Sequence, residues 1–129
     1  MSAGIIIRDA HFPGRAPIDA YGEGGFRFAD MSHRGSILCL PSGIRGWEPV
    51  EPAAFTAGDF ARVIDEAAEI DILLVGCGAE LRPLPASLRA ALREAGIAAE
   101  PMSTGSAVRT YNVLLAEERR VAAALVAVA

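Results

Sequence analysis

One strand-to-helix junction organises the predicted fold: Glu100-Pro101-Met102-Ser103-Thr104-Gly105-Ser106-Ala107-Val108-Arg109-Thr110-Tyr111-Asn112. A short apolar segment ends within it, and the hydroxyl side chains at 103–106 are suited to cap the start of a helix. Apolar residues then recur at helical spacing, namely Val108, Tyr111, Leu114 and Leu115. The helix is expected to end near residue 118, before two arginines that suit its C-terminal dipole. Because free N–H groups at a helix start attract anions, this junction is the first candidate ligand site.

Before the junction, strand and helix alternate along the chain. A continuous apolar run at 70–75, ended by Gly76-Cys77-Gly78, is typical of a parallel-sheet strand that is buried on both faces. The remaining predicted elements are helices at about 56–69, capped by Thr56 or Asp59, and at 85–95, ended by Gly96, and strands at 97–102 and 121–129. The last segment also has the alanine content of a helix, and we assign it to a strand because the sheet needs one more element.

The first fifty residues are expected to form β structure. The predicted pieces are strands at 5–7, 26–28, 36–40 and 44–50, a turn at 21–25, and a second turn at 30–33 between the two strands of an antiparallel ribbon. Two prolines, Pro49 and Pro52, confine the segment that carries Trp47 to a sheet edge. The whole chain, residues 1–129, is therefore predicted to be one three-layer α/β domain. It has a mixed central sheet, helices packed on that sheet and an N-terminal antiparallel β ribbon.

Composition excludes several classes of function. The net charge is −4 and all 12 basic residues are arginines without a basic stripe, so nucleic acid is not expected as a partner. The absence of lysine excludes Schiff-base chemistry. The chain is 52% hydrophobic with a mean hydropathy of +0.32, which suggests an apolar patch reserved for a partner.

Localisation is expected to be cytoplasmic, without membrane insertion. No segment has the length of an export signal or of a transmembrane helix. The two cysteines, Cys39 and Cys77, lie in apolar runs and are interpreted as buried free thiols in a reducing compartment.

Six stretches together resemble a known family. They are 21–27, 33–36, 40–43, 73–78, 88–92 and, longest and most specific, 104–115, which reads Thr104-Gly105-Ser106-Ala107-Val108-Arg109-Thr110-Tyr111-Asn112-Val113-Leu114-Leu115. The chain resembles, from about residue 4 to 128, a small domain-of-unknown-function family. Its animal members include the adipogenesis-associated domain-containing protein and the mitochondrial complex I assembly factor three.

This resemblance implies a compact α/β domain with a mixed sheet, a loose likeness to nucleotide-binding folds and no established enzymatic activity. The bacterial members of the family are uncharacterised, whereas the mitochondrial relative acts through protein partners during assembly of a respiratory complex. The resemblance therefore implies a protein partner and no cofactor.

The candidate anion or ligand site consists of Gly76, Cys77, Gly78, Thr104, Gly105, Ser106 and Arg109. Its two segments follow strands of a parallel sheet, where open α/β sheets bind ligands, and Arg109 offers a bidentate contact to a carboxylate or phosphate. The alternative interpretation is that these residues make only turns and caps, with Arg109 paired to a glutamate. The segment 76–81 lacks the third glycine of a dinucleotide-binding fingerprint.

No catalytic set and no metal site are predicted. His11 and His33 are the only histidines, and we expect His33 to lie in a turn and bond to backbone. Trp47 is either a lid over the core or an exposed anchor for a partner, and both alternatives stay open.

Three functions follow from these observations. The first is a non-catalytic interaction or assembly factor with a protein partner, similar to the complex I assembly proteins. The second is a small-molecule or anion-binding protein, or a weak enzyme, that uses the crevice between Gly76–Gly78 and Thr104–Arg109. The third is thiol redox chemistry at Cys39 or Cys77. A second copy of the chain is a further candidate partner.

Overall fold

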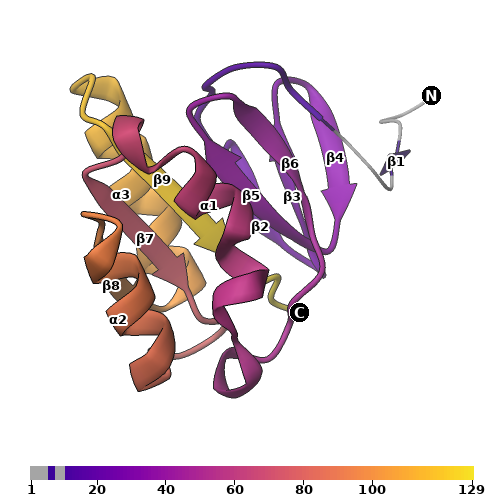
Figure 1. The fold of residues 1–129 in the computed structure, drawn as a ribbon. Helices are drawn as coiled ribbons and strands as arrows, with labels where there is room; N and C mark the ends of the chain where they lie inside the picture. The colour runs from indigo at the N-terminus through magenta and orange to yellow at the C-terminus, as the bar shows by residue number, and fades with distance from the viewer. Residues whose placement is uncertain (1–5, 8–10) are drawn as a thin grey trace.

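The computed structural model describes residues 6–7 and 11–129, which form two β-sheets and flanking helices (Figure 1). The first sheet has the order β1-β4-β3-β2 and comprises Ile6–Ile7, Met31–Arg34, Gly25–Phe28 and Ala20–Gly22 in that order. Of the predicted first strand, Ile5 lies outside the described residues. Strands β2, β3 and β4 pair in antiparallel fashion, which confirms the predicted N-terminal ribbon.

The second sheet has five strands in the order β6-β5-β9-β7-β8. Its strands are Gly43–Trp47, Ser36–Leu40, Val121–Leu125, Ile72–Gly76 and Ala98–Met102 in that order. β7 is parallel to both β8 and β9, whereas β5 is antiparallel to β6 and β9, so the sheet is mixed as predicted. The segment at 121–129 is thus a strand at its start, and β6 is an edge strand as its two following prolines indicated.

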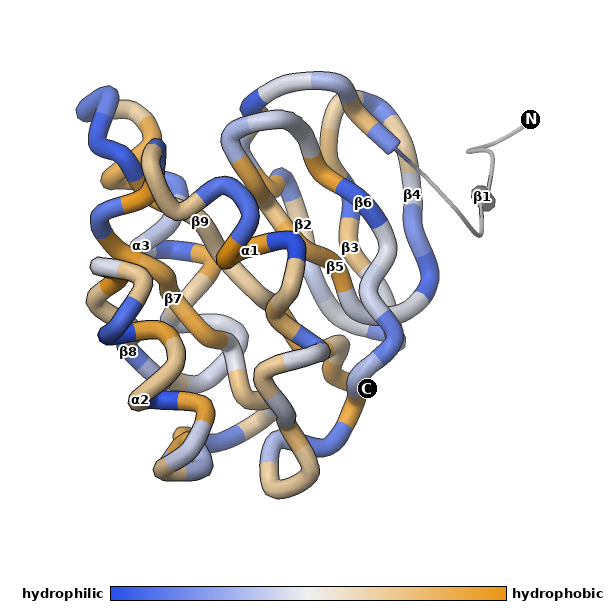
Figure 2. The backbone as a smooth tube through the Cα atoms, viewed as in Figure 1, coloured by the Kyte–Doolittle hydropathy of each residue, from blue (hydrophilic) through white to orange (hydrophobic). Residues whose placement is uncertain are grey.

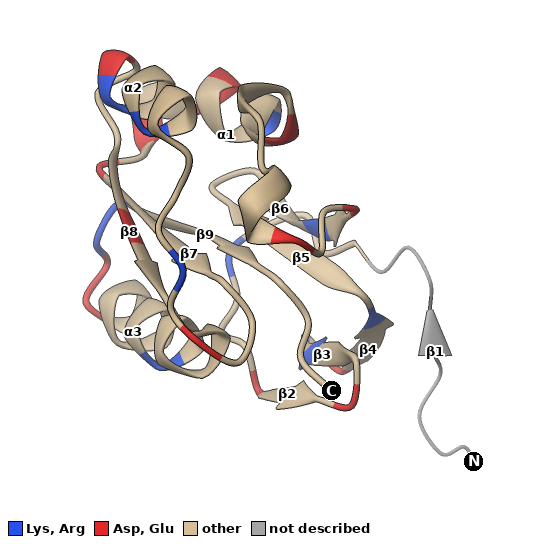
Figure 3. Ribbon diagram, turned by 90° about the horizontal axis from the view of Figure 1, so that it is seen from below, with Lys and Arg blue, Asp and Glu red and all other residues tan. Residues whose placement is uncertain are grey.

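The helical elements are η1 (Pro52–Ala54), η2 (Ala57–Phe60), α1 (Ala61–Asp65), η3 (Ala67–Glu69), α2 (Ala86–Glu94) and α3 (Thr104–Ala116). Figure 3 shows α1 and α2 on one side of the second sheet and α3 on the other, together with the ribbon strands. Figure 2 shows apolar segments along the interior strands β5 and β7 and hydrophilic segments in the outer turns. The molecule is therefore layered, with the five-stranded sheet in the middle.

Two apolar clusters occupy the two faces of that sheet. One lies under α1 and α2 and includes Leu38, Leu73 and Leu92; the other lies under α3 and the ribbon and includes Phe26 and Tyr111. Successive residues of β5, β7 and β9 alternate between the clusters, as the side chains of a strand that is buried on both faces must.

The predicted turn at 30–33 is wrong, because residues 31–34 form strand β4. The chain reverses earlier, at Ala29 and Asp30, which both adopt positive φ angles (49° and 62°) between β3 and β4. This is the geometry of a two-residue hairpin turn, which usually carries glycine or asparagine and so gave no sequence signal here. The strand at 36–40 belongs to the second sheet, and Gly35, with φ of 104°, separates it from β4.

The predicted helix over 56–69 forms as three short pieces rather than one. Its cap is confirmed: the Thr56 side chain accepts from the Asp59 N–H, and the Asp59 carboxylate accepts from the Thr56 N–H. Its apolar face is buried at Phe60 and Val63, whereas Ala68 is exposed. The helical path breaks at Phe60 and Glu66, where ψ is 16° at both residues.

Candidate functional site

The structure brings the two predicted site segments together at the carboxyl ends of β7 and β8. The N–H of Gly78 donates to the hydroxyl of Thr104 (3.0 Å), and the N–H of Thr104 donates to the carbonyl of Gly78 (2.8 Å). We call Gly76–Gly78 and Thr104–Arg109 the strand-end junction. Its two halves are thus in direct contact.

Thr104 is the centre of this junction and is fully buried. Besides accepting from Gly78, its hydroxyl donates to the carbonyl of Val126 at 2.6 Å. Gly76 leaves room for this arrangement, since a Cβ there would lie 2.9 Å from the Thr104 Cα. The Thr104 hydroxyl is therefore engaged by the protein itself.

The start of α3 is also occupied by groups of the chain. Ser103 caps the helix by accepting from the N–H of Ser106 at 3.2 Å. The Tyr21 hydroxyl lies against Gly105, where a Cβ would collide with it. Most of the junction thus consists of caps and turns, as in the alternative interpretation.

Arg109 is the junction residue that remains exposed. Its guanidinium donates to the hydroxyl of Ser106 at 3.4 Å and forms no ion pair with a carboxylate of the described chain, so the glutamate partner expected in the alternative interpretation is not found. An external carboxylate or phosphate would meet this guanidinium at the rim of the junction.

Tyr21 contacts the strand-end junction, and the sequence did not predict this contact. It is 42% exposed and comes from β2, more than eighty residues before α3 in the chain. No local pattern connects it with Gly105, because the contact is made only when the ribbon packs against the helix start.

Both cysteines are buried and free, as predicted. Cys77 contacts the carbonyls of Val75 and Arg82 through its sulfur, each at 3.6 Å. The thiol of Cys39 lies beside the hydroxyl of Tyr111, and burial raises the pKa of Cys39 and that of Tyr111 far above their ordinary range. A thiol that is buried in this way stays protonated at neutral pH and is a poor nucleophile.

His33 is a strand residue rather than a turn residue. It is buried in β4, and its Nε2 lies 3.2 Å from the backbone carbonyl of Ser36. The expected backbone contact is therefore confirmed, and the predicted turn location is wrong for the reason given above.

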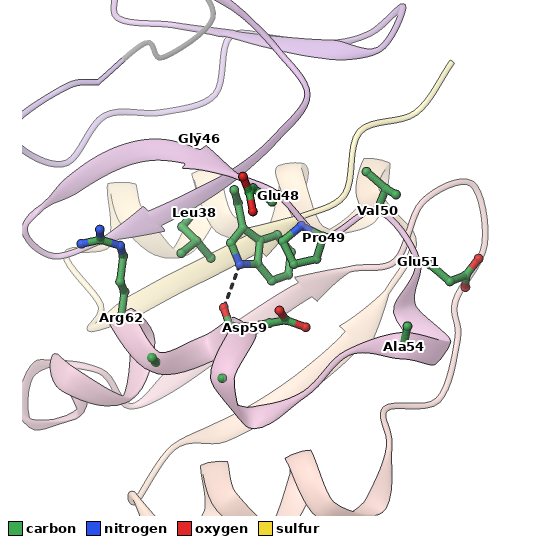
Figure 4. A pocket seen from close by; sticks show the side chains of 12 residues that line it. Leu38, Gly46, Glu48, Pro49, Val50, Glu51, Ala54, Asp59 and Arg62 are labelled. Carbon is green, nitrogen blue, oxygen red and sulfur yellow. Dashed lines mark hydrogen bonds between the residues drawn. The ribbon is translucent and has the colours of Figure 1, made fainter.

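A pocket of about 670 Å³ lies beside Trp47 at the end of β6 (Figure 4). We call it the Trp47 pocket. It is lined by Leu38, Gly46, Trp47, Glu48, Pro49, Val50, Glu51, Ala54, Gly58, Asp59, Ala61 and Arg62.

Trp47 forms one wall of this pocket and is held rigidly. Its ring packs against Phe55 and Phe60, with ring centroids 5.3 and 5.2 Å away, and its indole N–H donates to the carbonyl of Asp59 at 2.8 Å. Only 9% of the residue is exposed, so the structure places it in the core, as in the lid alternative. Exposed apolar surface at the rim comes instead from Val50, which is 68% exposed.

The polar lining of the pocket is mainly acidic. Glu48, Glu51 and Asp59 contribute carboxylates, whereas Arg62 is the one basic residue in the lining. Sequence reasoning did not identify these acidic residues as functional. Glu48 and Glu51 stand in a proline-containing segment whose pattern predicts only an irregular sheet edge.

The fold is that of a small mixed α/β domain. The chain belongs to the protein family of unknown function DUF498/DUF598, whose model matches residues 18–126. This confirms the resemblance that the sequence motifs indicated.

Two relatives are similar to this chain over most of its length. An uncharacterised protein of Rhodobacter capsulatus is 44% identical over 118 residues, which cover 92% of this chain and 90% of the relative. NADH dehydrogenase [ubiquinone] 1 alpha subcomplex assembly factor 3 of mouse is 30% identical over 122 residues. That match covers 95% of this chain but 66% of the mouse protein, so the chain spans about two thirds of the mouse factor.

Solved structures of relatives share the fold. A crystal structure described as an outer membrane protein from Bartonella henselae is 61% identical, with a TM-score of 0.88 over 92% of this chain and 99% of the other. An NMR structure of a Rhodopseudomonas palustris protein is 48% identical, with a TM-score of 0.80 over 93% and 88% of the two chains. The architecture is thus the one found in these relatives.

Among the described residues, no helix combines the length and the apolar character that crossing a bilayer requires.

Proposed function

We propose that this chain is a non-catalytic interaction factor that assists the assembly of a larger protein complex. The observation that carries the proposal is the match to the mouse assembly factor, which extends over 95% of this chain. The shared part therefore includes both sheets and α3 rather than one local motif. By analogy, the client is a subunit of an NADH dehydrogenase, and the site of action is the cytoplasm, where free thiols such as Cys39 and Cys77 persist.

The test combines partner capture with assembly in the host organism. The tagged full-length chain is cross-linked in living cells and purified, and assembled NADH dehydrogenase is measured on native gels with and without the gene. We expect reproducible recovery of NADH dehydrogenase subunits, and less assembled enzyme in the deletion strain. Failure to recover any partner, together with unchanged enzyme assembly, would remove the proposal.

Anion binding at the strand-end junction is the second candidate function, and the exposed guanidinium of Arg109 beside the start of α3 favours it. In thermal-shift measurements, added phosphate, nucleotides or dicarboxylates should raise the melting temperature of the wild type and not that of Arg109→Ala. An equal shift in the variant would show that the anion binds elsewhere.

A further inference from the structure

The Trp47 pocket adjoins the outer edge of β6, and the two features together suggest what kind of partner they fit. We propose that they bind an extended segment of a partner protein, with its backbone along β6 and an arginine or lysine side chain in the pocket. This inference rests on the proposed function as an interaction factor and names the chemistry of its partner.

The backbone of β6 supplies the first argument. β6 is the outermost strand of the five-stranded sheet, and Ile44 exchanges two hydrogen bonds with Phe12 on its outer side (3.0 and 2.9 Å). Every second residue of an antiparallel edge strand directs its N–H and C=O outward, so the next such residue is Gly46. Gly46 makes no hydrogen bond on that side with any residue of the described chain. An extended peptide can continue the ladder from this point.

The walls of the pocket supply the second argument. Pro49 and Val50, with the small part of the Trp47 indole that stays exposed, offer an apolar surface beside Gly46. Side chains alternate in direction along an added strand, so one in every two would point toward this surface. The aliphatic part of a long partner side chain can cover this surface and leaves no additional apolar area exposed.

Charge supplies the third argument and selects the side chain. Figure 4 shows Glu48 and Asp59 on opposite sides of the pocket, Arg62 at one end of it, and Glu51 farther off at the other end with its carboxylate directed outward. Glu51 and Asp59 each accept one backbone N–H, from Ala53 and Thr56, which fixes the two carboxylates in place. Glutamate or aspartate entering the pocket would be repelled, whereas arginine or lysine can lay its stem on the apolar wall and direct its charge at the carboxylates.

The direct test is an NMR titration of the full chain with two pools of capped octapeptides. Each pool contains valine, threonine and serine around one fixed central residue, which is arginine in the first pool and glutamate in the second. We expect the arginine pool to shift the amides of Gly46 and Glu48 and the indole N–H of Trp47, with an apparent affinity at least about tenfold above that of the glutamate pool. Equal binding of both pools, or no shift at these positions, overturns the proposal.

Two other occupants give distinct results in the same experiment. If a small cation were the natural ligand, arginine amide alone would bind as tightly as the arginine pool. If a second copy of the chain occupied the edge, the β6 amides would shift with protein concentration before any peptide was added. Either result overturns the commitment to a partner segment.

Matched variants separate this inference from the proposed function. Glu48→Gln with Glu51→Gln removes two pocket charges and keeps an acceptor for the Ala53 N–H, so the fold should be retained. Glu94→Gln with Glu117→Gln makes the same change in charge at two other exposed positions. We expect the pocket pair to bind the arginine pool about tenfold more weakly and the control pair to bind as the wild type does.

The same variants are then used in cellular cross-linking. If wild type and the pocket variant capture the same partner equally, the pocket is not the contact surface, although the proposed function stands. If no partner is captured by any form, the proposed function itself fails.

Discussion

A single hydroxyl, that of Thr104, connects three segments that are distant in the chain. It accepts from Gly78 after β7, donates to Val126 after β9, and belongs to the first residue of α3. The site that the sequence suggested for an anion is therefore also the place where the ends of two strands and a helix are fixed to one another.

We predict that Thr104→Val destabilises the protein by about 2–4 kcal/mol, because valine keeps the volume but leaves the Gly78 N–H and the Val126 carbonyl without their partner in a buried place. Thr104→Ser keeps the hydroxyl and should cost only about 1 kcal/mol, the value of one buried methyl group. Urea unfolding of both variants measures the difference. Similar losses in the two variants would show that the hydroxyl contributes little.

Cys39 and Tyr111 predict how stability depends on pH. Burial raises the pKa of both groups in the folded protein, so they stay protonated at a pH at which the unfolded chain loses protons. Below the pKa values that the two groups have in the unfolded chain, their contribution to the free energy of unfolding is complete. It is lost as the pH rises above about 9, by up to about 1.4 kcal/mol per pH unit for each group. Urea unfolding between pH 7 and pH 10.5 should show this fall.

The control for that experiment is Cys39→Ser, which keeps a hydrogen-bonding partner for Tyr111 and does not ionise in this range. Its stability should fall less steeply than that of the wild type above about pH 9. The same slope in both proteins would assign the effect to other groups.

At the scale of elements, the sequence predicted those features that depend on near neighbours. The buried strand β7 was read from a continuous apolar run, and the end of α2 from Gly96, which has a φ of 83°. The turn between β3 and β4 was predicted at 30–33, too late in the sequence, because Ala29 adopts a left-handed conformation that alanine rarely takes.

The candidate sites were predicted less completely than the helices and strands, because their residues come from distant parts of the chain. Gly78 and Thr104 were expected to meet because both follow parallel strands. The Tyr21 contact with Gly105 and the closure of the Trp47 pocket by η2 depend on how whole elements pack, and local spacing does not encode that packing. The sequence therefore predicted the strand-end junction but not Tyr21, which contacts it, nor the residues that line the Trp47 pocket.

The contact between β2 and the first turn of α3 can be tested by a double-mutant cycle. Gly105→Ala should gain about 0.5–1 kcal/mol of helix propensity, offset by the displacement of the Tyr21 ring from its place over Gly105. With Tyr21→Ala already present, the same substitution should be clearly more favourable. If the changes in the free energy of unfolding caused by the two substitutions were additive, the Tyr21 hydroxyl would have no energetic coupling to Gly105.

At the scale of the whole molecule, the two apolar clusters share one sheet. Leu38 and Cys39 are neighbours on β5 yet belong to opposite clusters, and the same alternation holds along β7 and β9. Loss of either cluster would expose one face of the same strands. The predicted single domain, residues 1–129, therefore remains our expectation for the folding unit.

This arrangement predicts one cooperative unfolding transition. The fluorescence of Trp47 reports on the cluster under α1 and α2, whereas far-ultraviolet circular dichroism reports on all elements. The two signals should give the same midpoint and the same free energy in urea. Two separated transitions would contradict a single folding unit.

Strand β9 has a consequence for how the molecule is made. It is near the end of the sequence, yet it lies in the middle of its sheet, with β5 on one side and β7 on the other. During synthesis, β5–β6 and β7–β8 leave the ribosome before the strand that joins them, and each pair then exposes the edge that β9 will cover. Nascent chains halted before Val121 should accordingly stay open to proteases and bind chaperones, and emergence of β9 should close the sheet in one step.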